Sequence, residues 1–69
     1  MPLTMATPGE VNLIKKVGGK AETRLFLENL GFIPGGQVSV ITRIGGNVIV
    51  EIKGARVAVN RDMAAKIMV

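Results

Sequence analysis

The fold of this chain is decided by residues 27–35, which read LENLGFIPG. The two leucines are three residues apart, so they share one face of a helix. Gly31 follows them and can adopt the left-handed conformation that ends a helix. Phe32 adds an aromatic side chain that we expect to be buried. Pro34 and Gly35 then preset a tight turn, because proline fixes φ and glycine accepts a positive φ. This stretch predicts a helix end and a turn that opens a strand.

A second proline–glycine pair, Pro8-Gly9, lies just before the first predicted strand, residues 10–17. Ile14 breaks the alternation of apolar side chains in that strand, which predicts a bulge or a sharp bend. Two glycines end the strand, and a helix of about three turns is predicted over residues 21–30. The side of this helix predicted to be more apolar consists of Thr23, Phe26, Leu27 and Leu30.

Three closely spaced strands follow the helix. They are predicted over residues 37–44, 48–53 and 56–60. Turns at residues 45–47 and at Gly54-Ala55 connect them, because glycine permits the backbone angles of a hairpin.

The sequence of residues 60–69 predicts one more helical turn and one more strand. Asn60 is placed to cap a helical turn over residues 61–66, and residues 67–69 are placed to close the sheet. Five short strands in one small domain, residues 1–69, favour a closed barrel over an open sheet, because closure removes exposed edges. We therefore predict a mainly β fold: a small barrel of about five strands with one inserted α-helix and a short C-terminal helical turn.

Composition limits the chemistry that this chain can perform. It has no cysteine and no histidine, so disulfides, thiolate metal sites and the usual general base near neutral pH are missing. The five acidic residues show no spacing that pairs two of them as acid and base, and none forms a cluster for a divalent cation. We predict no catalytic residue, no metal site and no cofactor, and a protein that is not an enzyme.

The formal net charge is +4, from nine basic and five acidic residues. No basic run exceeds two residues. The only aromatic residues are Phe26 and Phe32, so few aromatic side chains are available to stack on nucleic-acid bases. Nucleic acid is therefore not the expected partner, although a small nucleic-acid-binding barrel stays open as an alternative. Because no signal peptide or membrane span is present, we predict a cytoplasmic protein that does not insert into a membrane.

Together these motifs resemble the FeoA family, the small cytoplasmic component of bacterial ferrous-iron uptake. Arg24 and the residues after it resemble the family's R-x-x-L-x-x-L-G-F/M-x-P-G signature, and the likeness covers nearly the whole chain. The residues of this chain that match the family's structural motifs are Pro8, Gly9, Leu27, Leu30, Gly31, Phe32, Pro34, Gly35 and Gly54.

The resemblance implies an SH3-like β-barrel. It also implies a non-enzymatic accessory protein that docks on FeoB, the membrane GTPase–permease, and modulates it. Such a protein is cytoplasmic and reaches the inner membrane only through this partner. Transition-metal binding is attributed to the family in general terms, but no set of ligand residues in this sequence supports it.

One departure from the family lies on the helix, where often-polar positions hold Leu25 and Phe26. Phe26 is placed to tuck toward Leu30, whereas Leu25 lies opposite the face that carries Leu27 and Leu30. A single exposed leucine is ordinary on a protein surface. The alternative is a surface that binds the partner, or a weak homo-oligomer that buries these side chains. The candidate partner-binding residues are Arg24, Leu25, Phe26 and Glu28.

Overall fold

Six short strands form two antiparallel sheets in the structure, a computed structural model that describes residues 1–69. The larger sheet has the order β1-β3-β4-β5, and the smaller sheet pairs β2 with β6. The mainly β prediction is confirmed. The strands are β1 (Val11–Leu13), β2 (Lys16–Val17), β3 (Gln37–Ile44), β4 (Asn47–Ile52), β5 (Ala55–Asn60) and β6 (Ile67–Met68). The helices are η1 (Leu3–Met5, a 3₁₀ turn), α1 (Ala21–Leu30) and α2 (Arg61–Ala64).

The strand predicted over residues 10–17 bends at Ile14 and divides into β1 and β2. The Ile14 N–H donates to the Gly36 carbonyl at 2.9 Å, and the Ile14 carbonyl accepts from the Gly35 N–H at 2.8 Å. The next residue, Lys15, donates instead to the Met68 carbonyl at 2.8 Å. The chain therefore passes from one sheet to the other at Ile14, whose side chain is buried. The predicted bend is confirmed.

The helix α1 has the predicted bounds, and it ends as the sequence predicts. Gly31 has φ 109° and ψ 2°, and the Phe32 N–H donates to the Leu27 carbonyl at 2.9 Å. Both Leu27 and Phe32 are fully buried. The Gly36 N–H then donates to the Ile33 carbonyl at 2.9 Å, which closes the predicted proline–glycine turn before β3.

The β4–β5 turn lies one residue earlier than predicted. Ile52 pairs with Ala55, so the two turn residues are Lys53 and Gly54 and not Gly54 with Ala55. Their φ angles are 51° and 77°, as in a type I′ turn, whose twist matches that of the strands and which requires positive φ at both positions.

The final helical turn, α2, is capped as predicted but is shorter than residues 61–66. The Asn60 side-chain oxygen accepts from the Met63 N–H at 2.8 Å. The helix ends at Ala64 because the chain must extend to pair Ile67 with Val17 of β2.

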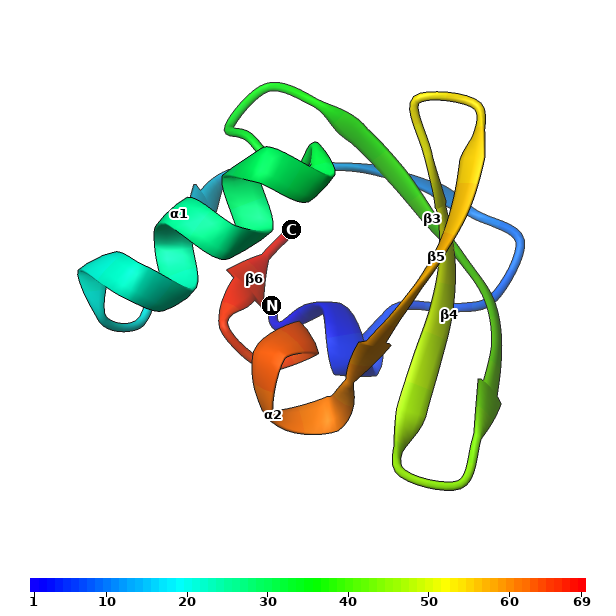
Figure 1. Cartoon of the computed structure of the whole chain (residues 1–69). Coiled ribbons are helices and arrows are strands. Elements are labelled where there is room, and N and C mark those ends of the chain that lie inside the picture. The colour runs from blue at the N-terminus through cyan, green and yellow to red at the C-terminus, as the bar shows by residue number, and fades with distance from the viewer.

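The core draws on both sheets, α1, α2 and the N-terminal segment. Leu3 in η1 is fully buried. This burial could not be predicted from the sequence, because an element of three residues is too short to show a hydrophobic period. Figure 1 shows α1 at one side of the molecule and the larger sheet at the other, with β6 between them. The largest fully buried side chains are Phe32, Leu3, Ile14, Leu27, Ile67, Val38, Val40 and Val50.

Candidate docking surface on helix α1

A narrow strip of side chains attaches α1 to the rest of the molecule. Leu27 is the one buried residue of this ten-residue helix, and Leu30 is half-buried against the core. No side chain caps the first turn, but Glu22 lies there, where a carboxylate interacts favourably with the helix dipole. Most of the surface of α1 is therefore available to solvent.

The four candidate residues all lie on this available surface. Leu25 is 59% exposed, as expected for a side chain opposite Leu27. Phe26 is 48% exposed, so about half of its side chain is available to solvent. Successive residues are about 100° apart around a helix, and the strip formed by Leu27 and Leu30 is too narrow to cover a side chain on its flank. Arg24 and Glu28 are also exposed.

The exposed face combines two large apolar side chains with one positive and one negative charge. Arg24 and Glu28 are four residues apart, so they are neighbours on the helix surface. Leu25 lies beside them and Phe26 lies further round. Apolar or aromatic anchors with charged groups at the rim are typical of protein–protein contacts. We call Arg24, Leu25, Phe26 and Glu28 the α1 face.

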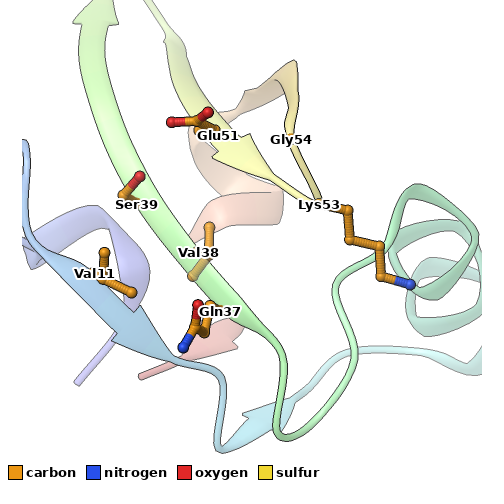
Figure 2. A pocket seen from close by; sticks show the side chains of 7 residues that line it. All are labelled: Val11, Gln37, Val38, Ser39, Glu51, Lys53 and Gly54. Atoms are coloured by element: carbon orange, nitrogen blue, oxygen red, sulfur yellow. The ribbon is translucent and has the colours of Figure 1, made fainter.

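A second surface feature is a hollow of about 390 Å³ on the larger sheet. Val11, Ser39 and Glu51 are register partners in a row across β1, β3 and β4, as Figure 2 shows. Glu51 is the one carboxylate that lines this hollow, so it provides no second carboxylate for paired acid–base chemistry. The complete lining is Val11, Gln37, Val38, Ser39, Glu51, Lys53 and Gly54.

The Lys53 side chain extends from this hollow toward the end of α1 (Figure 2). A Cβ atom placed on Gly31 would lie 3.4 Å from Lys53 Cδ, so the lysine methylenes pack close to the helix cap. This contact links the β4–β5 turn to the end of α1. No group of three or more acidic residues lies together as a metal site, and no helix is long and apolar enough to cross a membrane.

The family follows from comparison with known proteins, because the FeoA domain matches residues 1–69. The chain belongs to the FeoA domain family. Its relative in Methanocaldococcus jannaschii, whose name provisionally assigns it as Fe(2+) transport protein A, is 35% identical over 68 residues. That match covers 99% of this chain and 83% of the relative.

Solved structures show the same fold. A crystal structure of the iron uptake regulatory protein FeoA has a TM-score of 0.89 and 26% identity, over 99% of this chain and 92% of that chain. Iron(II) transport protein A from Clostridium thermocellum has a TM-score of 0.91 and 23% identity, over 99% of this chain and 43% of that one. A manganese-dependent transcriptional repressor has a TM-score of 0.87 and 17% identity, over 97% of this chain and 39% of that chain.

These matches confirm the resemblance to FeoA and the SH3-like small barrel. In this structure Leu27, Leu30 and Phe32 attach α1 to the core, and Gly31, Pro34 and Gly35 lie in the helix end and the turn that follows it. Leu25 and Phe26 lie outside the buried core and are 59% and 48% exposed.

Proposed function

We propose that this FeoA-family chain is a cytoplasmic, non-enzymatic accessory protein of ferrous iron uptake that docks on FeoB, the membrane GTPase–permease, and modulates it. Family membership and the Fe(2+) transport name of its relative support the pathway. The α1 face supports the mode of action. The observation that carries this proposal is the exposure of Leu25 and Phe26 on a helix whose apolar contacts with the core are made by Leu27 and Leu30.

The α1 face suits a reversible contact. Fully burying a leucine or phenylalanine contributes about 1.5–3 kcal/mol. Because only 59% of Leu25 and 48% of Phe26 is exposed, the two together supply roughly 1.5–3 kcal/mol. Association costs at least about 4 kcal/mol in lost motion, so a complex also needs neighbouring contacts and is weak. Arg24 and Glu28 at the rim orient the partner more than they tighten the complex.

Modulation by such a chain acts through the conformation of the partner. A bound protein shifts its partner's equilibrium only as far as it binds one state more tightly than the other. The α1 face therefore changes nucleotide turnover or transport if it meets a surface that differs between two states of FeoB. None of the four side chains on this face needs to enter the nucleotide site.

Titration of the soluble GTPase domain of FeoB from the same organism tests this proposal. We expect Leu25→Glu to weaken binding about tenfold or more, since hot-spot losses reach about 2 kcal/mol and 1.4 kcal/mol is tenfold. The matched control is Ile44→Glu, which makes the same charge change at a side chain that is 64% exposed on β3. This control should bind as the wild type does.

Two results would contradict the docking proposal. One is the absence of binding by the wild type together with normal iron uptake after deletion of the chain. The other is a homo-oligomer in sedimentation that Leu25→Glu converts to a monomer, because the α1 face would then be occupied by a second copy.

A further inference from the structure

A separate hollow of about 240 Å³ lies at the tip of the β3–β4 hairpin. Arg43 and Arg61 both line it, and no carboxylate does. We propose that this hollow binds a terminal phosphate group in its dianionic form, either on a small phosphorylated solute or on a phospholipid whose headgroup is a phosphate monoester, as in phosphatidic acid. The complete lining is Thr4, Arg43, Gly45, Gly46, Asn47, Val48 and Arg61.

Arg43 is held in place by the N-terminal segment. One of its terminal nitrogens, Nη2, donates to the Thr4 carbonyl at 2.8 Å and to the Ala6 carbonyl at 2.7 Å. A guanidinium has five N–H donors, so three remain after these two bonds. Arg43 is therefore positioned by its own fold and keeps donors for a ligand.

Arg61 is brought to the same hollow by a backbone contact. Its N–H donates to the Gly46 carbonyl at 2.9 Å, which holds the β5–α2 junction against the hairpin turn. The Arg61 side chain is exposed, and Asn47 adds an amide that can donate beside it. The hollow thus gathers donors from two strands and a helix.

Charge and size both favour a phosphate group. Two guanidinium groups carry two positive charges at every accessible pH, and a phosphate dianion balances both, whereas one carboxylate balances only one. Asp62 follows Arg61 in the chain but does not line the hollow. The volume lies below the roughly 300 Å³ at which sites for drug-sized ligands begin, so it fits a small ionic group. Arginine is also the side chain whose geometry best matches phosphate oxygens.

This hollow lies far from the α1 face. In Figure 1 the tip of the β3–β4 hairpin is at the bottom of the view, and α1 is at the upper left. Phosphate binding is therefore independent of docking through α1, and either can fail without the other.

Amide chemical-shift titration of the labelled chain tests the proposal. The probes are inorganic phosphate, adenosine monophosphate, and phosphatidylcholine vesicles with and without phosphatidic acid, all at constant ionic strength set with sodium chloride. We expect saturable shifts at the amides of Gly46, Asn47 and Arg61. Arg61→Gln should weaken binding about tenfold, the effect of losing a hydrogen bond to a charged group.

Arg56→Gln is the matched control, because it removes the same charge from β5 at a residue outside the hollow. Its titration should equal that of the wild type, and thermal unfolding of both variants verifies that they fold. Saturation by the two soluble phosphates supports a solute ligand. Saturation only by vesicles that contain phosphatidic acid supports a lipid headgroup. The absence of saturable shifts with every probe, or equal shifts in Arg61→Gln, would overturn the proposal.

Discussion

The helix α1 ends at Gly31, which adopts a left-handed conformation. Replacing Gly31 with alanine measures how much this glycine contributes to the free energy of unfolding. A left-handed conformation costs a residue with a Cβ about 1–2 kcal/mol, and φ 109° at Gly31 lies beyond the usual left-handed angle of about 57°. The new Cβ would lie 3.4 Å from Lys53 Cδ and 3.8 Å from Ile52 Cδ1, which is ordinary contact, so no clash adds to the cost. We expect Gly31→Ala to lose about 2 kcal/mol.

Thermal unfolding followed by circular dichroism, with urea unfolding beside it, measures this loss. At about 4–8 °C per kcal/mol for a domain of this size, Tm should fall by roughly 8–16 °C. The control is Gly46→Ala, because Gly46 has no positive φ and a Cβ there meets nothing within 4 Å. This control should be neutral or gain up to about 1 kcal/mol by restricting the unfolded chain. A loss below about 0.5 kcal/mol in Gly31→Ala would refute the left-handed cap as the helix terminator.

Further predictions concern packing and capping. Asn60→Ala removes the oxygen that accepts from Met63 and should cost about 1 kcal/mol in urea unfolding; no loss would mean that α2 does not depend on this cap. Leu27→Ala should cost about 2–5 kcal/mol because its side chain is fully buried. Leu25→Ala on the same helix should stay within about 0.5 kcal/mol, and equal losses would contradict the orientation of α1. Leu3→Ala should also cost about 2–5 kcal/mol, whereas an unchanged stability would exclude the N-terminal segment from the core.

The elements with local signals were predictable from the sequence. The helix over residues 21–30 ends at a glycine, and the last helical turn begins at Asn60, so both boundaries depend on side chains and backbone freedom within a few residues. The bend at Ile14 was also visible as a break in alternation. The cause of the bend could not be predicted from the sequence. At Ile14 the chain changes from pairing with β3 to pairing with β6, and both partners are distant in sequence.

Features that depend on distant packing could not be predicted in the same way. Leu3 is buried by elements far along the chain, and its three-residue turn has no periodicity. The exposure of Phe26 depends on how wide a strip of α1 the barrel covers, which helix periodicity does not specify. The Lys53-Gly54 turn required the register of β4 with β5, since glycine alone allows either of two turn positions.

The same distinction holds for the candidate sites. The candidate residues of the α1 face could be proposed from sequence because they lie within five positions of one helix, where spacing indicates which side chains point away from Leu27. The hollow at the hairpin tip was missed because Arg43 and Arg61 are isolated in the sequence. The pairing of Arg43 with Val48 and of Asn47 with Asn60, together with the backbone bond from Arg61 to Gly46, brings them to one place, and no pattern along the chain indicates it.

The most direct test of the central claim, docking through α1, is an amide chemical-shift map of the labelled chain during titration with the soluble GTPase domain of FeoB. We predict saturable perturbations centred on Arg24, Leu25, Phe26 and Glu28, with little change at the β3–β4 hairpin tip. Perturbations centred instead on Ser39 and Glu51 of the larger sheet, or no perturbation at saturating partner, would contradict docking through α1.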